Sequence, residues 1–573
     1  MKKRNIYRIM SCIMLLVSVS CTEVFDVEQL DQAPVQDLDF EAVFSDYQQF
    51  RRYLDYGYGY MPNNLSRLWN SLVSELSDEC EGVGGDVCSP VFNNGAWSAD
   101  VSSLSGTDYH ARNELEFLWN DLFSGIRQAN MVIEHIDMVE NFPSQDIYDR
   151  SLGEAYFLRA YMYFELVKRW GAVPLFDKPL ELGVDDLDLP RATYEECIAF
   201  IEADCNTAAG LLDLTNSEGD TGRATKGAAL ALKSRTLLYA ARPLNNPEND
   251  IDKWKAAADA AWEVINLNQY SLDPDYVNMF FRPDLGTEII MNRPRTKLTF
   301  EQGRPSNNSS FFVRIALPGG NYNGWGVTGV TGSFVDLYED SNGYPITNAA
   351  SNYTLTDPYV NRDPRLRMTV LYNDRFWFNK NIELYKSDSQ GRQGTEYNKI
   401  GYAIAKFWPE AHQRYKGTST YLNYIFFRYA EILLNYAEAV NEAYGPDGTN
   451  PGAGLTAREA TTLVRERVNH VPIPLDISSS TDTMRERIIN ERAIELCFEE
   501  QRWYDVISWN RGVEIFGADN PIKGMESTKN ADGTFTYEPF VYETRTFKSH
   551  MHRYPIPNSE IFKSSVLEQN PEW

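Results

Sequence analysis

The chain has 573 residues, of which 43% are hydrophobic and 24% charged, so it has enough apolar material for a large folded core and is not a disordered polypeptide. Its formal net charge of −27 produces a negative field that repels nucleic acids and anionic lipid headgroups, because no basic patch follows the first residues. Aromatic residues make up 13% of the chain, more than a helical core needs, which favours an aromatic binding surface.

The N-terminus has the pattern of an export signal over residues 1–20. A short basic start precedes an apolar run over residues 9–19, which is about half the length of a membrane-spanning helix. The four residues that end in Cys21 resemble a bacterial lipoprotein cleavage box, although Ser18 replaces the usual Leu or Val. This resemblance implies that Cys21 is acylated and anchors the mature chain to a membrane. Secretion without an anchor is the alternative.

Five of the seven cysteines lie beyond the cleavage box, and an odd number argues against a complete disulfide framework. Cys80 and Cys88 flank a Gly-rich loop over 81–86, which belongs to an acidic stretch over 79–86, and two alternatives are open for it. A disulfide would close the loop, or its carboxylates would bind a Ca²⁺ ion. Cys197 and Cys205 lie in a helical pattern and are predicted to be buried as small apolar residues.

After an extended tether over residues 21–46, the sequence predicts one body over 47–573 with two helix-rich regions, about 115–268 and about 425–510. In both regions apolar residues recur at intervals of three and four positions, which is the period of an amphipathic helix. The predicted helices cover residues 115–137, 152–170, 194–212, 225–241, a helix that includes 254–261, and then 429–443, 456–468 and 484–509.

Short motifs mark the starts and the packing of these helices. Thr193 and Glu196 are spaced as a capping box, in which a hydroxyl and a carboxylate satisfy free backbone amides, and so are Thr483 and Glu486. Residues 254–261 have the spacing of the first helix of a tetratricopeptide repeat. The predicted fold class is therefore mostly α, an irregular tetratricopeptide-like helical repeat scaffold with an irregular insertion of loops and short strands.

The insertion covers about residues 271–422. The helical period fades there, and Gly, Asn, Pro, Tyr and Phe dominate, as in residues 319–326. Long irregular segments are uncommon inside compact domains and often carry binding sites. The ligand-binding function is therefore predicted to lie in this insertion.

The sequence lacks the recurrent catalytic motifs. It has no phosphate-binding loop that ends in Lys-Ser or Lys-Thr, no Gly-x-Ser-x-Gly elbow and no histidine pair spaced for zinc. We therefore predict that the protein is not an enzyme and that it uses neither a metal nor a cofactor, the open Ca²⁺ alternative aside. Glycoside hydrolysis needs only two carboxylates, and 81 acidic residues offer many pairs, so a surface glycoside hydrolase is an alternative.

Six motifs in chain order resemble the SusD/RagB family of nutrient-binding proteins and span essentially the whole mature chain. Their Arg, Glu and aromatic residues are predicted to pack and pair between helices, and their prolines to fix turns. The motifs occupy residues 159–174, 224–229, 362–365, 428–433, 491–505 and 554–571.

The family resemblance implies a lipoprotein on the extracellular side of the outer membrane that covers a TonB-dependent, SusC-like transporter like a lid. Such a protein captures oligosaccharides and delivers them to the transporter without performing chemistry. Capture of peptides, as in the RagB branch, is the alternative, because both ligand classes are bound by aromatic and hydrogen-bonding side chains.

The resemblance also indicates residues that bind the ligand. Asn323-Gly324-Trp325 resembles a stretch of the starch-binding family member in which the Trp stacks on the sugar, and Tyr322 precedes it. A ring face suits the apolar C–H side of a pyranose, while amides bind its hydroxyl groups. We therefore expect Tyr322, Asn323 and Trp325 to contact the ligand.

A second stretch, which begins at Asp78, resembles the same family member. Gly84 stands where that member carries another stacking Trp, so starch specificity is not implied. Trp97 is a candidate to replace this ring. Asp78 and Trp97 complete the predicted ligand-binding set.

Overall fold

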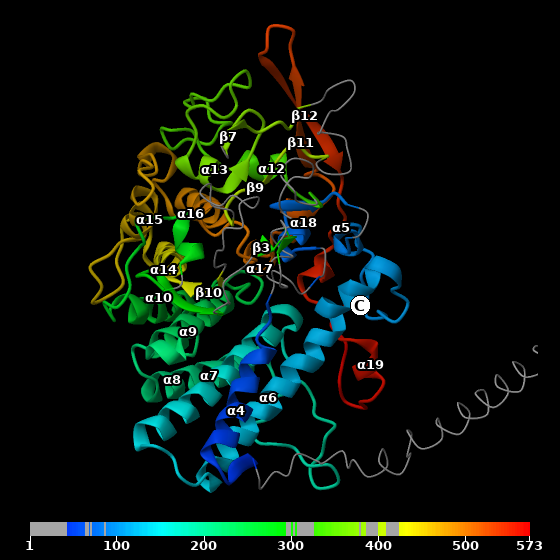
Figure 1. Ribbon diagram of the computed structural model, residues 1–573, viewed down its shortest axis with the longest axis vertical. Coiled ribbons are helices and arrows are strands. Elements are labelled where there is room, and N and C mark those ends of the chain that lie inside the picture. The colour runs from blue at the N-terminus through cyan, green and yellow to red at the C-terminus, as the bar shows by residue number, and fades with distance from the viewer. Residues whose placement is uncertain are drawn as a thin grey trace, which may run out of the picture.

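A computed structural model of the chain consists mainly of stacked helices (Figure 1). It describes residues 43–63, 68, 71–84, 87–282, 284–293, 300–301, 304–305, 326–377, 380–385, 399–407 and 423–573. Short two-stranded sheets lie among loops in the insertion and near the C-terminus. The predicted fold class is thus confirmed.

The scaffold is a ladder of helices in which each packs against its neighbour in the chain. The last helix before the insertion packs directly against the first helix after it, so the insertion leaves the ladder continuous. The ladder helices are α6 (Leu118–His135), α7 (Gln145–Trp170), α8 (Tyr194–Leu211), α9 (Lys226–Ala241), α10 (Ile251–Ile265), α14 (Tyr429–Tyr444), α15 (Ala457–Glu466) and α16 (Thr481–Glu495).

Shorter helices lie at both ends of the chain and in the insertion. They are α4 (Tyr47–Gly57), α5 (Ser89–Asn93), α12 (Gly332–Val335), α13 (Pro364–Thr369), α17 (Arg502–Ser508), α18 (Gly512–Phe516) and α19 (Asn558–Ile561). The strands are β1 (Cys80–Gly82), β2 (Ile289–Arg293), β3 (Phe300–Glu301), β4 (Arg304–Pro305), β5 (Thr328–Val330), β6 (Val370–Leu371), β7 (Phe376–Trp377), β8 (Lys380–Asn381), β9 (Ala403–Ile404), β10 (Tyr424–Arg428), β11 (Ile522–Lys529) and β12 (Phe535–Glu543).

Two antiparallel strand pairs attach the insertion to the rest of the chain. β2 pairs with β10, which brings the two ends of the insertion together, and β1 pairs with β5. A third pair, the β11–β12 hairpin, projects from the upper end of the molecule in Figure 1.

Buried ion pairs connect neighbouring helices of the ladder. Arg159 on α7 contacts Asp204 on α8 at 2.7 Å, and Arg235 on α9 contacts Glu431 on α14 at 2.6 Å. Such paired charges tolerate burial because each satisfies the other. Arg159 and Glu431 belong to the family motifs, so the predicted pairing of motif residues between helices is confirmed.

The predicted helices are present, and the capping box of Thr193 and Glu196 at the start of α8 is confirmed. The second predicted box is wrong. α16 begins at Thr481, and its N-cap Ser480 forms the box with Thr483, so Glu486 lies inside the helix. Several polar residues before the apolar positions can cap a helix, and the helix begins at the earlier of the two possible N-termini.

The single helix predicted over 484–509 is two helices, α16 and α17. Phe498 and Glu500 have φ angles of +61° and +65°, which an α-helix excludes. Contacts from distant residues stabilise the break, because the Phe498 amide donates to Glu79 at 2.8 Å and Glu500 accepts from the Ser74 hydroxyl at 2.9 Å.

The five described cysteines are buried free thiols, so Cys80 and Cys88 form no disulfide. Cys197 and Cys205 are fully buried, as predicted. Among the described residues, no cluster of three or more His, Cys, Asp or Glu side chains is arranged to hold a metal ion. The helices of the described part all fall short of the length and apolarity that a membrane crossing requires. Cys21 lies outside the described residues.

Candidate functional site

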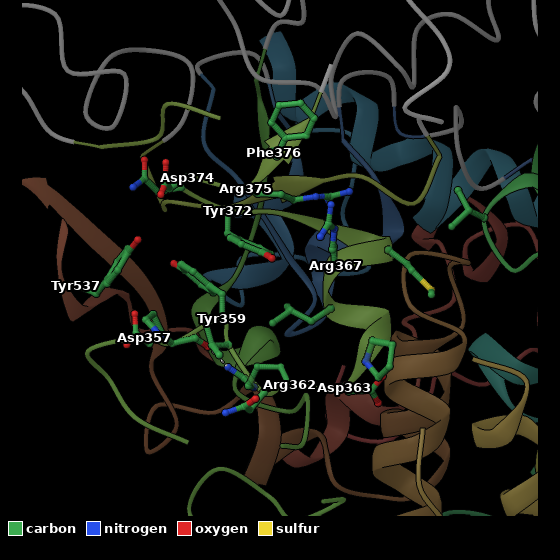
Figure 2. A pocket seen from close by; sticks show the side chains of 18 of the residues that line it. Asp357, Tyr359, Arg362, Asp363, Arg367, Tyr372, Asp374, Arg375, Phe376 and Tyr537 are labelled. Carbon is green, nitrogen blue, oxygen red and sulfur yellow. Dashed lines mark hydrogen bonds between the residues drawn. The ribbon is translucent and has the colours of Figure 1, made fainter. Parts of the chain in front are cut away.

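A cleft of about 930 Å³ lies between α13, the loop before it, the turn after it and Tyr537 on strand β12 of the hairpin (Figure 2). Most of its walls come from residues 357–376 of the insertion, and Tyr537 of β12 contributes from the hairpin. Segments that are distant in the sequence therefore form one concave surface, which is where proteins typically bind small ligands.

Arg362 fixes the loop that forms one wall of the cleft. Its guanidinium donates to three carbonyl oxygens, those of Pro358, Val335 and Tyr338, at 2.7, 2.8 and 2.7 Å. It also lies over the Tyr353 ring, 5.1 Å from the ring centroid. Because carbonyl oxygens accept from both of its terminal nitrogens, Arg362 shapes the wall of the cleft.

Asp363 and Arg365 fix the helix that follows. The Asp363 carboxylate caps α13 by accepting from the Arg365 amide at 2.8 Å, and Pro364 occupies the first turn, where it loses no hydrogen bond. Burial alone would raise the pKa of Asp363, but the guanidinium of Arg365 and neighbouring cations hold it at about 2. Asp363 is therefore a permanent anion and not a proton donor for catalysis.

Aromatic rings form the middle of the cleft. Tyr359 and Tyr372 are stacked, with ring centroids 4.1 Å apart and an interplanar angle of 21°, and Tyr537 meets Tyr359 edge-on at 5.3 Å. Phe376 at the rim is 53% exposed. Stacked and edge-on rings of this kind provide flat apolar faces for a ligand.

Polar groups surround these rings. Figure 2 shows Asp357, Asp374 and Tyr537 on one side of the stacked tyrosines and Arg367 on the other. Asp357, Asp374 and Arg367 are exposed to solvent. Flat apolar faces edged by carboxylates and a guanidinium suit a polyhydroxylated ligand, which needs both ring contacts and hydrogen-bond partners.

The structure places Trp97 in the core and not in a cleft. Its side chain is 3% exposed, because Tyr554 and Trp573 pack against it with ring centroids 5.1 Å away and Trp503 at 6.4 Å. In this arrangement the ring supports the fold and offers no face to a ligand.

Asp78 is also buried, and it forms a two-point ion pair with Arg502, with both contacts at 2.9 Å. Its carboxylate oxygens are therefore occupied by a partner from α17. Tyr322, Asn323 and Trp325 lie outside the described residues, and their predicted contact with a ligand stays a prediction.

Sequence reasoning missed the rings of the cleft. The motif at 362–365 was recognised, but only as a structural feature, and it is the segment that holds the cleft together. Tyr359 and Tyr372 flank this motif, so the aromatic residues around it were a usable signal. Tyr537 carried no such signal, since only the folded chain brings it to Tyr359.

Two family models match the chain. One, described as the SusD family, matches residues 287–573, and the other, described as starch-binding associating with outer membrane, matches residues 68–238. Together they cover most of the helical ladder and most of the insertion, and residues 239–286 lie between the two matches.

Similar proteins agree with these matches. A SusD-like protein of Formosa agariphila is 25% identical over 98% of this chain and 99% of its own length, and another from the same organism is 26% identical over 74% of this chain and 78% of its own length.

Solved structures agree in fold. A SusD-like protein of Bacteroides fragilis has a TM-score of 0.74 at 26% identity, covering 95% of this chain and all of its own. A SusD-like carbohydrate-binding protein of the same organism has a TM-score of 0.71 at 21% identity, covering 92% of this chain and all of its own. Because the SusD family model matches half of the chain, the chain belongs to the SusD family.

Proposed function

We propose that this protein is a lipid-anchored protein of the outer cell surface that captures oligosaccharides and delivers them to a SusC-like, TonB-dependent transporter. The observation that carries the proposal is the aromatic cleft in a chain of the SusD family. Solved relatives are described as carbohydrate-binding and as laminarin-binding, and one matching model is described as associating with the outer membrane.

The cleft suits a sugar for physical reasons. The apolar C–H face of a pyranose packs on an aromatic ring, and Phe376 and Tyr372 present rings at the rim and in the middle. The exposed carboxylates of Asp357 and Asp374 accept hydrogen bonds from hydroxyl groups, and Arg367 donates them. Binding of this kind is non-covalent and needs no cofactor.

Tyr322, Asn323 and Trp325 are proposed to extend the binding surface beyond the described cleft, on the family resemblance alone. The anchor is proposed at Cys21, for the same reason. Both proposals are tested by substitution below.

The test compares two exposed phenylalanines in the soluble chain from Thr22 to Trp573. Phe376 lies at the rim of the cleft, whereas Phe562, 83% exposed beside α19, lies outside it. We expect Phe376→Ala to weaken binding of an oligosaccharide about tenfold, or about 1.4 kcal/mol, because the sugar loses a ring face. Phe562→Ala should leave the affinity unchanged.

Calorimetry with a panel of oligosaccharides and peptides gives the affinities, and chromatography of the same mixtures detects products. Trp325→Ala enters the same panel as the test of the sequence-predicted residue. Equal affinities for Phe376→Ala and the wild type would remove the cleft from the proposal. Release of reducing ends would mean a glycoside hydrolase, and binding of peptides alone would mean a peptide-capturing protein.

A further inference from the structure

Some charged side chains of the cleft are buried and bonded to other groups of the protein, whereas others are exposed to solvent. Arg362 and Arg375 are buried, and their guanidinium groups donate to backbone carbonyl oxygens, in Arg375 to that of Val370 at 2.7 Å. Asp363 forms a buried ion pair with Arg365. These groups shape the walls, so a ligand meets other charges first.

The two exposed carboxylates lie on one side of the cleft, because Figure 2 shows Asp357 and Asp374 on the same side of the stacked tyrosines as Tyr537. Burial is the main cause of the raised pKa of Tyr537, and the Asp374 and Asp357 carboxylates add to the increase. Asn381 donates to Asp374 at 2.8 Å and orients its carboxylate. One side of the cleft is therefore anionic.

Arg367 lies on the opposite side of the stacked rings. Burial raises the pKa of Tyr372, and the guanidinium groups of Arg375, Arg367 and Arg362 offset part of this increase. Figure 2 shows it across the rings from Asp357 and Asp374. Among the described residues, it is the exposed cation of a cleft whose exposed anions include both of these carboxylates.

This arrangement distinguishes ligands by charge. Two carboxylates accept hydrogen bonds from neighbouring hydroxyls of an uncharged sugar without electrostatic penalty. A polyanionic glycan carries a carboxylate or sulfate on every residue or two, so its binding would bring like charges close to Asp357 and Asp374. The net charge of −27 adds long-range repulsion.

We infer that the cleft takes uncharged oligosaccharides and rejects polyanionic ones, and that Asp357 and Asp374 determine this specificity. The inference rests on the proposed function and adds the chemical class of the glycan.

The experiment measures binding of uncharged hexasaccharides of glucose, mannose and xylose and of an oligouronate of equal length to the chain from Thr22 to Trp573, by calorimetry at about 50 mM and about 500 mM salt. We expect an uncharged oligosaccharide to bind with an affinity that changes less than about twofold with salt, and the oligouronate not to bind.

Asp357→Asn/Asp374→Asn removes both charges while keeping the size of the side chains. We expect this double variant to bind the oligouronate measurably, with an affinity at least about tenfold above the detection limit that the wild type fails to reach. The control is Glu140→Gln/Asp146→Asn, which removes two exposed charges at and before the start of α7, outside the cleft. It makes the net charge less negative by the same two units as the Asp357/Asp374 double variant, but outside the cleft. Oligouronate binding should therefore stay as in the wild type.

Three results would overturn the inference. If the wild type binds oligouronate more tightly than uncharged sugars, and salt weakens that binding, the class of glycan is wrong while glycan capture stands. If both double variants behave alike, Asp357 and Asp374 do not set the specificity. If no oligosaccharide of either class binds, the proposed function itself fails, and this inference fails with it.

Discussion

Arg365 is fully buried, and its guanidinium group lies among the carboxylates of Asp363, Glu491 and Glu495. This contact joins the helix under the cleft to α16 of the ladder. A buried carboxylate that loses its partner is strongly destabilised, because the protein interior solvates a lone charge poorly. The position of the cleft thus depends on one side chain.

We expect Arg365→Met to lower the free energy of unfolding by about 3–5 kcal/mol, since it leaves excess negative charge around Glu491. Denaturant-induced unfolding measures the loss. The control is Lys255→Met, which breaks an exposed pair with Asp252 and should leave the stability close to that of the wild type. Similar losses in the two variants would contradict the assignment of Arg365 as a structural counter-charge.

Two buried carboxyl groups near the start of the chain, those of Glu75 and Glu79, have raised pKa values and so favour the protonated form. Burial raises the pKa of Glu79 to about 7 and that of Glu75 to about 7. Each carboxyl has an ordinary pKa near 4.5, so the folded chain holds protons that the unfolded chain releases. The stability that these groups contribute is full below about pH 4.5 and is lost as the pH rises through about 7.

Glu79→Gln keeps an acceptor for the Phe498 amide and carries no charge at any pH. We expect the variant to exceed the wild type in stability by about 1–3 kcal/mol at about pH 8 and to match it at about pH 4.5. Thermal unfolding across this pH range provides the measurement. The exposed Glu538→Gln on β12 serves as the control, and stability curves for Glu79→Gln that run parallel to the wild type would refute the prediction.

At the scale of elements, the β11–β12 hairpin places Tyr537 in the cleft. Contacts of β11 with the body of the protein determine the position of the hairpin. The Met525 amide donates to the Ile400 carbonyl at 3.0 Å. A β-carbon on the adjacent Gly524 would lie 2.8 Å from that carbonyl oxygen and 2.6 Å from the Phe540 ring. Only glycine lets this strand approach so closely.

Gly524→Ala should therefore push the hairpin away from the body. We expect a loss of about 1–3 kcal/mol in stability and, because Tyr537 moves with the strand, weaker binding of the oligosaccharide. Gly59→Ala, where a β-carbon meets open space, is the matched control. Unchanged binding in Gly524→Ala would show that the hairpin does not shape the cleft.

At the scale of the whole molecule, the lipid anchor proposed at Cys21 would hold the acidic body at the membrane surface. Its charge of −27 disfavours contact with anionic headgroups, so a lipid is the attachment that we expect.

Cys21→Ala should move the protein from the membrane fraction to the soluble fraction, as detected by fractionation and immunoblotting. Cys12→Ala, inside the export signal, should leave the protein on the membrane. Recovery of Cys21→Ala with membranes of cells that lack the partner transporter would contradict a lipid anchor at this residue.

The sequence by itself determined the elements with local causes. The helices of the ladder followed from apolar residues at intervals of three and four, and the start of α8 from Thr193 and Glu196, because a helix and its cap depend on neighbours within a few positions. The family followed from motifs that recur in a fixed order. These features need no knowledge of distant contacts.

Only the tertiary structure decided which side chains face a ligand. Asp78 has a loop-like local sequence, yet it is buried because Arg502, 424 positions later, pairs with it. Tyr537 joins Tyr359 for the same kind of reason, since the hairpin folds back over the insertion. Burial and cleft formation depend on contacts between residues far apart in the chain, and local sequence patterns do not encode those contacts.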